Sequence, residues 1–216
     1  SPDWLMQTHR GIDKIIVPSE HAKSGFEKTS YQIINEQAKT ETLLECACPV
    51  EVVPYPIKTI EPDHIDLDIK TKFNFLSVAL LGPRKNIEQL VKCFVEEFKD
   101  ESVGLVLKTG VSKGSIMDRE ETRQVIRKTI KQLGDSYKKR KCKVYLLHGD
   151  LSESQIHSLY NRDDIHAYVT AAHAEGYGLP IFESAYSGLP IIATDWSGHI
   201  DFLQAPYVES GKLKNK

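Results

Sequence analysis

FNFLSVALLGPRKNIEQLVKCFVEEFKD, residues 73–100, predicts a strand, a tight turn and a helix in direct succession. The apolar run 73–81 ends at Gly82-Pro83, which is typical of a buried strand. Apolar residues then recur at helical spacing and predict an amphipathic helix over 86–100. Asn86 followed by Gln89 indicates a capping box at the start of this helix. Such a unit is the building block of an α/β sheet.

The same alternation continues downstream of this unit. Further strands are predicted at 103–108, 143–148, 165–172 and 190–195, and further helices at 117–133, 152–160 and 179–187. Ser152 with Gln155 predicts a second capping box, while Pro180 and Gly188 mark the two ends of the last helix. Strands that are apolar on both faces and alternate with helices predict a Rossmann-like parallel sheet of five strands with helices on both faces.

The residues upstream of the sheet are less regular. Strands are predicted at 13–19 and 50–56, a helix at 20–27, and weak helical character over 28–48. Residues 57–72 combine prolines and acids with few large apolar groups, which indicates a linker. The chain opens without a methionine and closes on a polar tail from Gly211 to Lys216, so we expect a piece of a longer product.

Composition excludes several classes of protein. The 216 residues amount to about one and a half ordinary domains. A net charge of −2 argues against a nucleic-acid partner and a polybasic membrane surface. No apolar run or leader predicts membrane insertion or secretion. Four cysteines without zinc spacing predict reduced thiols in a cytoplasmic protein.

Ligands of parallel α/β sheets bind beyond the carboxyl ends of the strands, and one loop there is rich in candidate residues. It is HAEGYGLPIFE, residues 173–183. Its glycines let a ligand approach the backbone, and the following helix start donates N–H groups to an anion or a hydroxyl-rich ligand. Glu175 and Glu183 would accept hydrogen bonds from sugar or ribose hydroxyls, with His173 as a further polar contact. Glu88 and Glu96 have the same spacing in another part of the chain, so the glutamate pair alone is not specific and only the whole string 173–183 is.

Two further loops are candidates. Arg84 and Lys85, next to a helix start, could hold a diphosphate, although two solvated basic residues are the plain alternative. Gly198, in the turn Trp196–His199, could offer a backbone N–H to phosphate or be purely structural. The histidines lack metal spacing and no suitable Asp-x-Asp pair occurs, so no metal or cofactor is predicted. The absence of GxSxG, Walker and GxGxxG motifs argues against hydrolases of that type, P-loop NTPases and dehydrogenases.

In this order, these loops resemble the donor-binding C-terminal domain of GT-B glycosyltransferases, specifically the retaining family four. The resemblance runs from Ile12 to Leu203. It is carried by IIVPSEHAKSGF (15–26), VEVVPYPI (50–57), PRKN (83–86), HGDLSESQIHSLYNRDD (148–164), EGYGLPIFE (175–183) and GLPIIATDWSGHIDFL (188–203).

The resemblance implies roles for individual residues. Glu175 and Glu183 match the E-x7-E motif, in which the first, catalytic glutamate contacts the transferred sugar and the second the ribose. Lys85 with Arg84 would bind the diphosphate. Backbone N–H groups for sugar and phosphate would come from Gly176, Tyr177, Gly178 and Leu179. Leu80 stands where many members carry an arginine, so phosphate binding would lean on Arg84.

The resemblance also implies a domain organisation and an activity. Residues 1–56 would be a remnant of the N-terminal acceptor domain, 57–72 a linker, and 73–216 a donor-binding domain truncated at its C-terminus. The expected reaction transfers a hexose, with retention, from a UDP-, GDP- or ADP-linked sugar to a sugar or glycan acceptor.

The isolated chain would then be weakly active or inactive, and the face left by the missing domain could drive self-association. Two alternatives stay open. One is a nucleotide-sugar epimerase of the same architecture, and the other is a non-catalytic module that binds nucleotide sugar.

Overall fold

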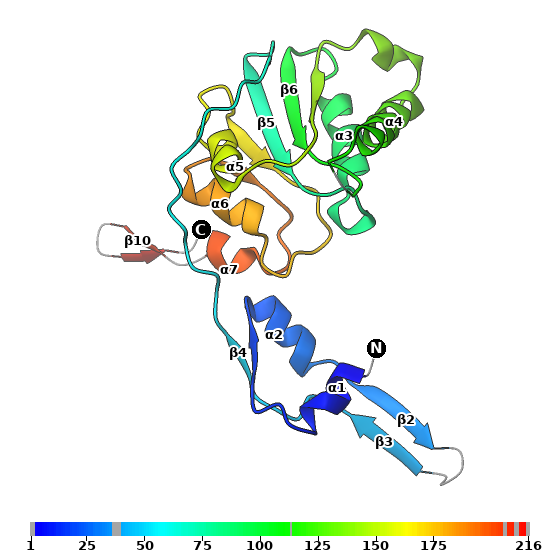
Figure 1. The fold of residues 1–216 in the computed structure, drawn as a ribbon, viewed down its shortest axis with the longest axis vertical. Coiled ribbons are helices and arrows are strands. Elements are labelled where there is room, and N and C mark those ends of the chain that lie inside the picture. The colour runs from blue at the N-terminus through cyan, green and yellow to red at the C-terminus, as the bar shows by residue number, and fades with distance from the viewer. Residues whose placement is uncertain (1–2, 36–39, 113, 205–206, 210–211, 215–216) are drawn as a thin grey trace. The chain divides into compact units, whose positions relative to one another are not determined.

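The computed structural model describes residues 3–35, 40–112, 114–204, 207–209 and 212–214, and the chain divides into two compact units (Figure 1). We call the first the N-terminal unit; it comprises residues 1–56, 175–178 and 197–216. The second, called the sheet unit, comprises residues 57–174 and 179–196. The predicted polar tail, Gly211 to Lys216, lies partly outside the described residues.

The sheet unit contains the predicted five-stranded parallel sheet. Its strands, in the spatial order β7-β6-β5-β8-β9, are β7 (Lys143–Leu147), β6 (Val103–Lys108), β5 (Phe73–Val78), β8 (Ala167–Val169) and β9 (Ile191–Ile192). Helices α3 (Ile87–Glu97) and α4 (Ile116–Gln132) lie on one face, and α5 (Glu153–Tyr160) and α6 (Leu179–Tyr186) on the other (Figure 1). The predicted α/β class is therefore confirmed, with strands β8 and β9 shorter than expected.

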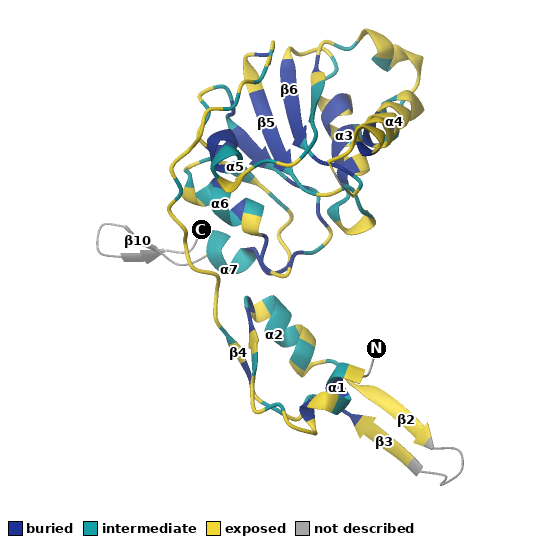
Figure 2. Ribbon diagram, in the orientation of Figure 1, coloured by how far each residue is buried: buried dark blue, intermediate teal, exposed yellow. Residues whose placement is uncertain are grey.

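The core forms where α3 and α4 pack on the central strands. Strands β5 and β6 are buried almost throughout, whereas the outer side of α4 is exposed (Figure 2). The apolar stripe of α3 supplies five buried residues, namely Ile87, Leu90, Val91, Phe94 and Val95. Strand order reverses at β5, between its pairing with β6 and its pairing with β8, and in such sheets ligands bind beyond the carboxyl ends of the strands at this point.

The two expected capping boxes have different outcomes. Ser152 and Gln155 form the predicted box at α5, with both reciprocal bonds present. The prediction for Asn86 and Gln89 was wrong. Asn86 adopts a left-handed conformation, φ 54°, and its side chain makes no capping bond; instead its Nδ2 donates to the carbonyl of Ala171 at 3.2 Å. A bond across the unit therefore replaces the local cap.

The N-terminal unit is built around a short parallel pair, β1 (Ile15–Val17) and β4 (Val50–Val52). Its helices are α1 (Asp3–Thr8), α2 (Glu20–Glu27) and α7 (Ile200–Leu203), and its remaining strands include β10 (Tyr207–Glu209) and β11 (Lys212–Lys214), an antiparallel pair. The weak helical character expected over 28–48 was wrong. Strands β2 (Tyr31–Asn35) and β3 (Thr40–Leu44) form an antiparallel hairpin there, because the β-branched run around Ile33 favours extended backbone.

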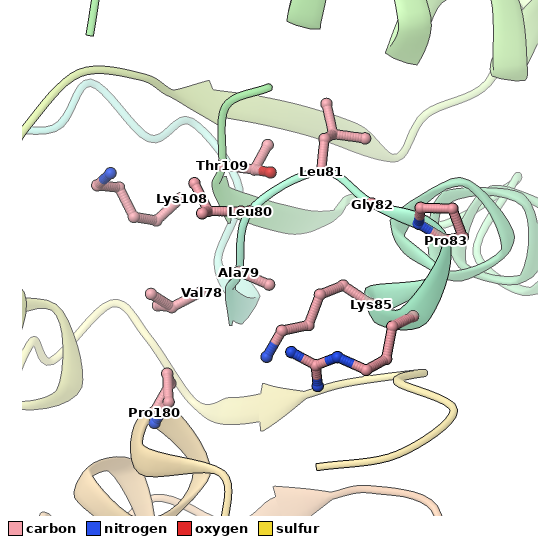
Figure 3. Close-up of a pocket in the computed structure, with 11 residues that line it drawn as sticks. Val78, Ala79, Leu80, Leu81, Gly82, Pro83, Lys85, Lys108, Thr109 and Pro180 are labelled. Carbon is pink, nitrogen blue, oxygen red and sulfur yellow. The ribbon is translucent and has the colours of Figure 1, made fainter. Parts of the chain in front are cut away.

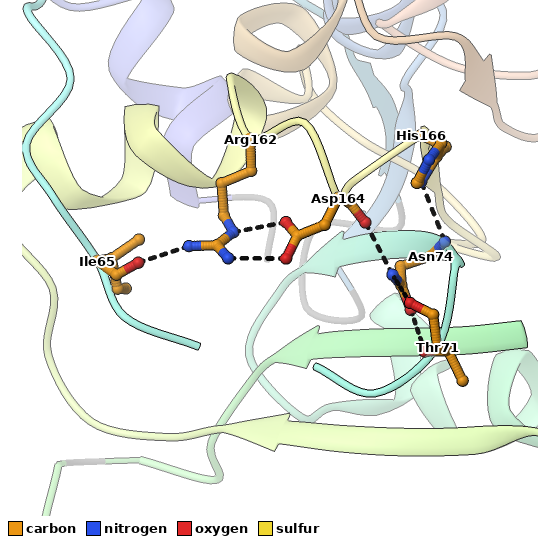
Figure 4. Close-up of polar contacts among 6 residues, drawn as sticks. All are labelled: Ile65, Thr71, Asn74, Arg162, Asp164 and His166. Carbon is orange, nitrogen blue, oxygen red and sulfur yellow. Dashed lines mark hydrogen bonds and ion pairs between the residues drawn. The ribbon is translucent and has the colours of Figure 1, made fainter. Parts of the chain in front are cut away.

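Residues 57–72 contain no helix or strand and are held to the sheet unit by polar contacts (Figure 4). Arg162 donates two hydrogen bonds to the carboxylate of Asp164, both at 2.7 Å, and a third to the carbonyl of Ile65. Asn74 donates to the carbonyls of Thr71 and Asp164. These bonds fix the segment that leads into β5.

Arg162→Met tests this anchor. The Arg162 guanidinium holds the pKa of Asp164 below its ordinary value, so the pair stabilises the fold above the unfolded-state pKa of about 4 and loses that contribution as pH falls through the folded-state value. We expect the variant to lose about 1 kcal/mol at pH 7, given the partial exposure of the pair, and the difference to shrink below pH ~4. Urea unfolding at both pH values measures it. Arg127→Met removes the same charge from the exposed side of α4 and should change little; equal stability of Arg162→Met and wild type at pH 7 would contradict the anchor.

Gly104 on β6 lies next to the hydrogen-bond network of Asn74. A Cβ built there would lie 2.0 Å from Oδ1 of Asn74, which is held by its own hydrogen bonds. Gly104→Ala should therefore lower the free energy of unfolding by about 1–3 kcal/mol or more. Gly82→Ala is the matched control, because Gly82 has extended backbone and open space around it. Equal stabilities for the two variants would refute the steric argument.

Candidate functional site

A cavity of about 480 Å³ lies at the carboxyl ends of the central strands (Figure 3). It is lined by residues 78–85, from the end of β5 and the following turn, by Lys108 and Thr109 at the end of β6, and by Pro180 of α6. The lining holds three cationic side chains, Arg84, Lys85 and Lys108, and no carboxylate among the described residues. This charge pattern suits an anion.

The backbone around the cavity explains why these side chains meet. The amide of Ala79 donates to the carbonyl of Lys108 and that of Leu81 to Gly110, so the ends of β5 and β6 stay paired beyond the regular ladder. The chain then turns through the short 3₁₀ helix η1 (Pro83–Lys85) into α3. The cations of the turn and of β6 thus reach one cavity.

The turn is also tied to the loop after β8. Arg84 donates from Nη1 to the carbonyl of Ala174 at 2.6 Å, and its own carbonyl accepts from the amide of His173 at 2.8 Å. His173 is therefore brought next to Arg84 through its backbone, while its side chain is exposed.

Glu183 lies on the second turn of α6 and is paired with Tyr160 of α5. The Tyr160 hydroxyl donates to Oε2 of Glu183 at 3.1 Å. Burial raises the pKa of Glu183, and the hydrogen bond from Tyr160 opposes that rise. Burial and the nearby Glu183 carboxylate likewise raise the pKa of the Tyr160 hydroxyl. Among the described residues, Glu183 does not line the cavity, whereas Pro180 of the same helix does.

A second, smaller cavity of about 40 Å³ adjoins the first along Leu80, Lys108 and Thr109. Its wall includes a buried pair in which Nε2 of His148 and Oδ2 of Asp118 are 2.5 Å apart. Asp118 also accepts a hydrogen bond from the amide of Ser112. The pair therefore joins the loop after β6 to the loop after β7.

Of the remaining predicted residues, Leu179 begins α6 in the sheet unit, and the others belong to the N-terminal unit. The amide of Glu175 donates to Oγ of Ser197 at 2.8 Å, and the amide of Gly198 donates to the carbonyl of Glu175 at 2.9 Å. Ser19, the N-cap of α2, donates from Oγ to the carbonyl of Gly176. A Cβ on Gly198 would lie 2.1 Å from that same carbonyl oxygen, so only glycine fits there.

The next two residues of that loop complete the arrangement. The ring of Tyr177 packs edge-on against Tyr55, with centroids 5.3 Å apart, and against Phe202 at 5.1 Å. Gly178 has φ +90°, a conformation that side-chain-bearing residues rarely adopt. The structure therefore holds Glu175, Gly176, Tyr177 and Gly178 in one constrained loop with Gly198.

Sequence reasoning missed three residues of the sheet unit. Lys108 and Thr109 line the cavity, and Tyr160 binds Glu183. The signal for Lys108 was present, because a cation at the end of a buried strand points to the ligand edge of the sheet. Tyr160 had no such signal, since its partner lies 23 residues away.

Among the described residues, no group of three or more histidines, cysteines or acids is placed to hold a metal ion. In the same part of the chain, no helix has the length and apolar character needed to cross a membrane.

The variant Tyr160→Phe tests whether the Tyr160 hydroxyl lowers the pKa of Glu183. Without the hydroxyl, the pKa of Glu183 should rise further, because the hydrogen bond that opposes the effect of burial is lost. Because the folded-state pKa of Glu183 is above its unfolded-state value, the free energy of unfolding falls as pH rises from the unfolded-state to the folded-state pKa. The variant has the higher folded-state pKa, so above this range it should be less stable than wild type by about 1 kcal/mol. Carbon-13 NMR titration of the Glu183 carboxyl measures the shift. Tyr186→Phe on the exposed side of α6 is the control, and identical midpoints in wild type and Tyr160→Phe would disprove the coupling.

Comparison with known proteins identifies the family. The family described as "Glycosyl transferases group 1" matches residues 60–207. A sucrose synthase of Melioribacter roseus is 32% identical over 149 residues, which cover 67% of this chain and 18% of that protein. The GtfA subunit of a UDP-N-acetylglucosamine–peptide N-acetylglucosaminyltransferase of Streptococcus pneumoniae is 25% identical over 191 residues, covering 86% of this chain and 33% of that subunit. The chain thus spans a third or less of the length of these curated relatives.

Solved structures show the same fold. The structure described as "Trehalose-6-phosphate from E. coli bound with UDP-2-fluoro glucose" matches with a TM-score of 0.51 and 14% identity, over 88% of this chain and 47% of that one. TarM matches with a TM-score of 0.52 and 16% identity, over 89% of this chain and 32% of that one. The five-stranded parallel sheet with helices on both faces is the arrangement these GT-B structures share. The chain therefore belongs to the group 1 glycosyltransferase family and has the GT-B type of α/β fold.

Proposed function

We propose that this chain is the donor-binding part of a retaining glycosyltransferase that transfers a hexose from a nucleotide-diphosphate sugar to a sugar or glycan acceptor. The observation that carries the proposal is the 480 Å³ cavity at the point where strand order reverses, lined by Arg84 and Lys85 without a carboxylate. In a chain of this family, an anion-binding cavity at that point suits the diphosphate of the donor.

The chemistry of transfer explains why cations are needed there. When the bond between the anomeric carbon and the diphosphate oxygen breaks, the electron pair stays with the diphosphate and negative charge builds on it. Lys85 and Arg84 would stabilise that charge by preorganised electrostatics, because the bonds of Arg84 to Ala174 and His173 already fix the turn. The acceptor hydroxyl oxygen would form the new bond at the anomeric carbon, and its proton would pass to the leaving diphosphate.

Glu183 suits the ribose of the donor. A carboxylate accepts hydrogen bonds from hydroxyls, and the Tyr160 hydroxyl, which lowers the pKa of Glu183, favours the ionised form. The resemblance assigns Glu175 to the transferred sugar. Its support is the constrained backbone of residues 175–178, which is the property that a loop presenting N–H groups to sugar and phosphate requires.

The acceptor and the rest of the reaction belong to a larger protein in this proposal. The match covers a third or less of the length of the curated relatives. We therefore interpret residues 1–56 as part of an acceptor domain, 57–72 as a linker and 73–216 as the donor domain. We expect weak turnover by this chain alone and self-association through a face that such a domain would cover.

Calorimetric titration with UDP, GDP and ADP tests the proposal. One nucleotide should bind saturably, with UDP the first choice because UDP appears in the names of one relative and one matched structure. Lys85→Met and Glu183→Gln should each weaken binding about tenfold or more, since each removes a charge-assisted contact. Lys128→Met, on the exposed side of α4, removes the same charge as Lys85→Met and should bind as wild type.

Other results would point elsewhere. No binding of any of the three nucleotides at millimolar concentration would contradict the proposal. Conversion of a nucleotide sugar to its epimer without acceptor would favour an epimerase. Binding that persists unchanged in Lys85→Met would show that the nucleotide lies outside this cavity, and unchanged binding in Glu183→Gln would contradict the role of Glu183 toward the ribose.

A further inference from the structure

Lys108 contributes a cation to the cavity from a different element than Arg84 and Lys85. It ends β6 and pairs with Val78 of β5, whereas the other two belong to the turn after β5 (Figure 3). It also lines the adjoining smaller cavity, so it stands between the two spaces. A ligand that extends from the turn toward β6 would pass this side chain.

The Lys108 ammonium is half-buried and makes no direct ion pair, although the Asp150 carboxylate lines the same small cavity. In the part of the chain that the structure describes, it makes no hydrogen bond and no ion pair within 4 Å. Burial lowers its pKa, and the carboxylate of Asp150, which would raise it, does not overcome that effect. A desolvated cation without a partner is unfavourable unless an anion binds beside it.

Thr109 gives a second, independent observation. The residue is 2% exposed, and its hydroxyl has no hydrogen-bond partner among the described residues. Two other described hydroxyls share this state, those of Ser77 and Thr122, but only Thr109 lines the cavity. Buried hydroxyls are normally paired, so an unpaired one at a cavity wall indicates a ligand atom.

We propose that Lys108 and Thr109 bind phosphate oxygens of the same nucleotide diphosphate, with the ammonium and the hydroxyl as donors. This inference rests on the proposed function and adds a second group of contacts at the β6 side of the site. The turn and the end of β6 would then hold the diphosphate from two directions. Two-sided contact fixes its orientation, which contact by the turn alone does not.

The test uses isosteric variants with matched controls. Lys108→Met should weaken binding of the nucleoside diphosphate and of inorganic pyrophosphate about ten- to hundredfold, because a charge-assisted hydrogen bond is lost. Lys108→Arg should recover most of this loss. Lys128→Met removes an exposed lysine of α4 and should bind both probes as wild type.

The variants Thr109→Val and Thr122→Val distinguish an effect on ligand binding from an effect on the stability of the fold. Thr109→Val should weaken both probes about three- to tenfold and leave the free energy of unfolding unchanged or higher, since the hydroxyl has no partner to lose. Thr122→Val removes an equally buried and unpaired hydroxyl from α4 and should change stability in the same direction without affecting binding.

The outcomes distinguish this inference from the proposed function. Nucleotide binding by wild type with unchanged affinity in Lys108→Met overturns the inference and leaves the function standing. Pyrophosphate binding that depends on Lys108, without binding of any nucleotide, supports the phosphate site and overturns the nucleotide assignment. Binding of neither probe by wild type overturns both.

Discussion

Strand β5 pairs with β6 on one side and β8 on the other, and this double pairing is the constraint on which the sheet unit depends. The side chains of Phe75 and Leu76 are buried between the helix layers, so the strand has no face that could turn to solvent. Because the chain order reverses at β5, its carboxyl end is where parallel α/β sheets bind ligands, and there Arg84 joins the following turn to the loop after β8. The cavity lies beside that turn and is lined by the ends of β5 and β6 and by Pro180.

The polar groups around β5 show how the fold tolerates charge close to its core. At its amino end, Asn74 and Arg162 satisfy the carbonyls of the linker and leave room only for glycine at position 104. At its carboxyl end, cations collect without carboxylates. The buried polar groups at the first end are hydrogen-bonded within the protein, whereas the Thr109 hydroxyl at the second end has no hydrogen-bond partner among the described residues.

Whether a buried polar side chain has a hydrogen-bond partner within the protein also distinguishes structural from functional residues in this chain. His148 and Asp118 are buried and bonded to one another, which identifies them as a brace between two loops. Tyr160 and Glu183 are also hydrogen-bonded. Burial raises the pKa of the Glu183 carboxyl and the bond from Tyr160 lowers it, so the charge of Glu183 depends on both. Lys108 and Thr109 have no such partners among the described residues, and this contrast gives them a role toward ligand.

The amino-acid sequence by itself determined the alternation of strands and helices from Phe73 onward, the capping box at Ser152 and the order of the candidate loops. These features depend on neighbours within a few residues, and hydrophobic periodicity and turn residues record such neighbours. The same local information placed Arg84 and Lys85 in a turn after a strand, where the structure has them.

Only the tertiary structure decided what lies beside that turn. The strand order brings Lys108 and Thr109, more than twenty residues further along the chain, to the same cavity. It also makes Asn86, an expected helix cap, a partner of Ala171, and it pairs residues 31–35 with 40–44 as antiparallel strands instead of a weak helix. Strand order and long-range hydrogen bonds depend on residues far apart in sequence, so no local pattern records them.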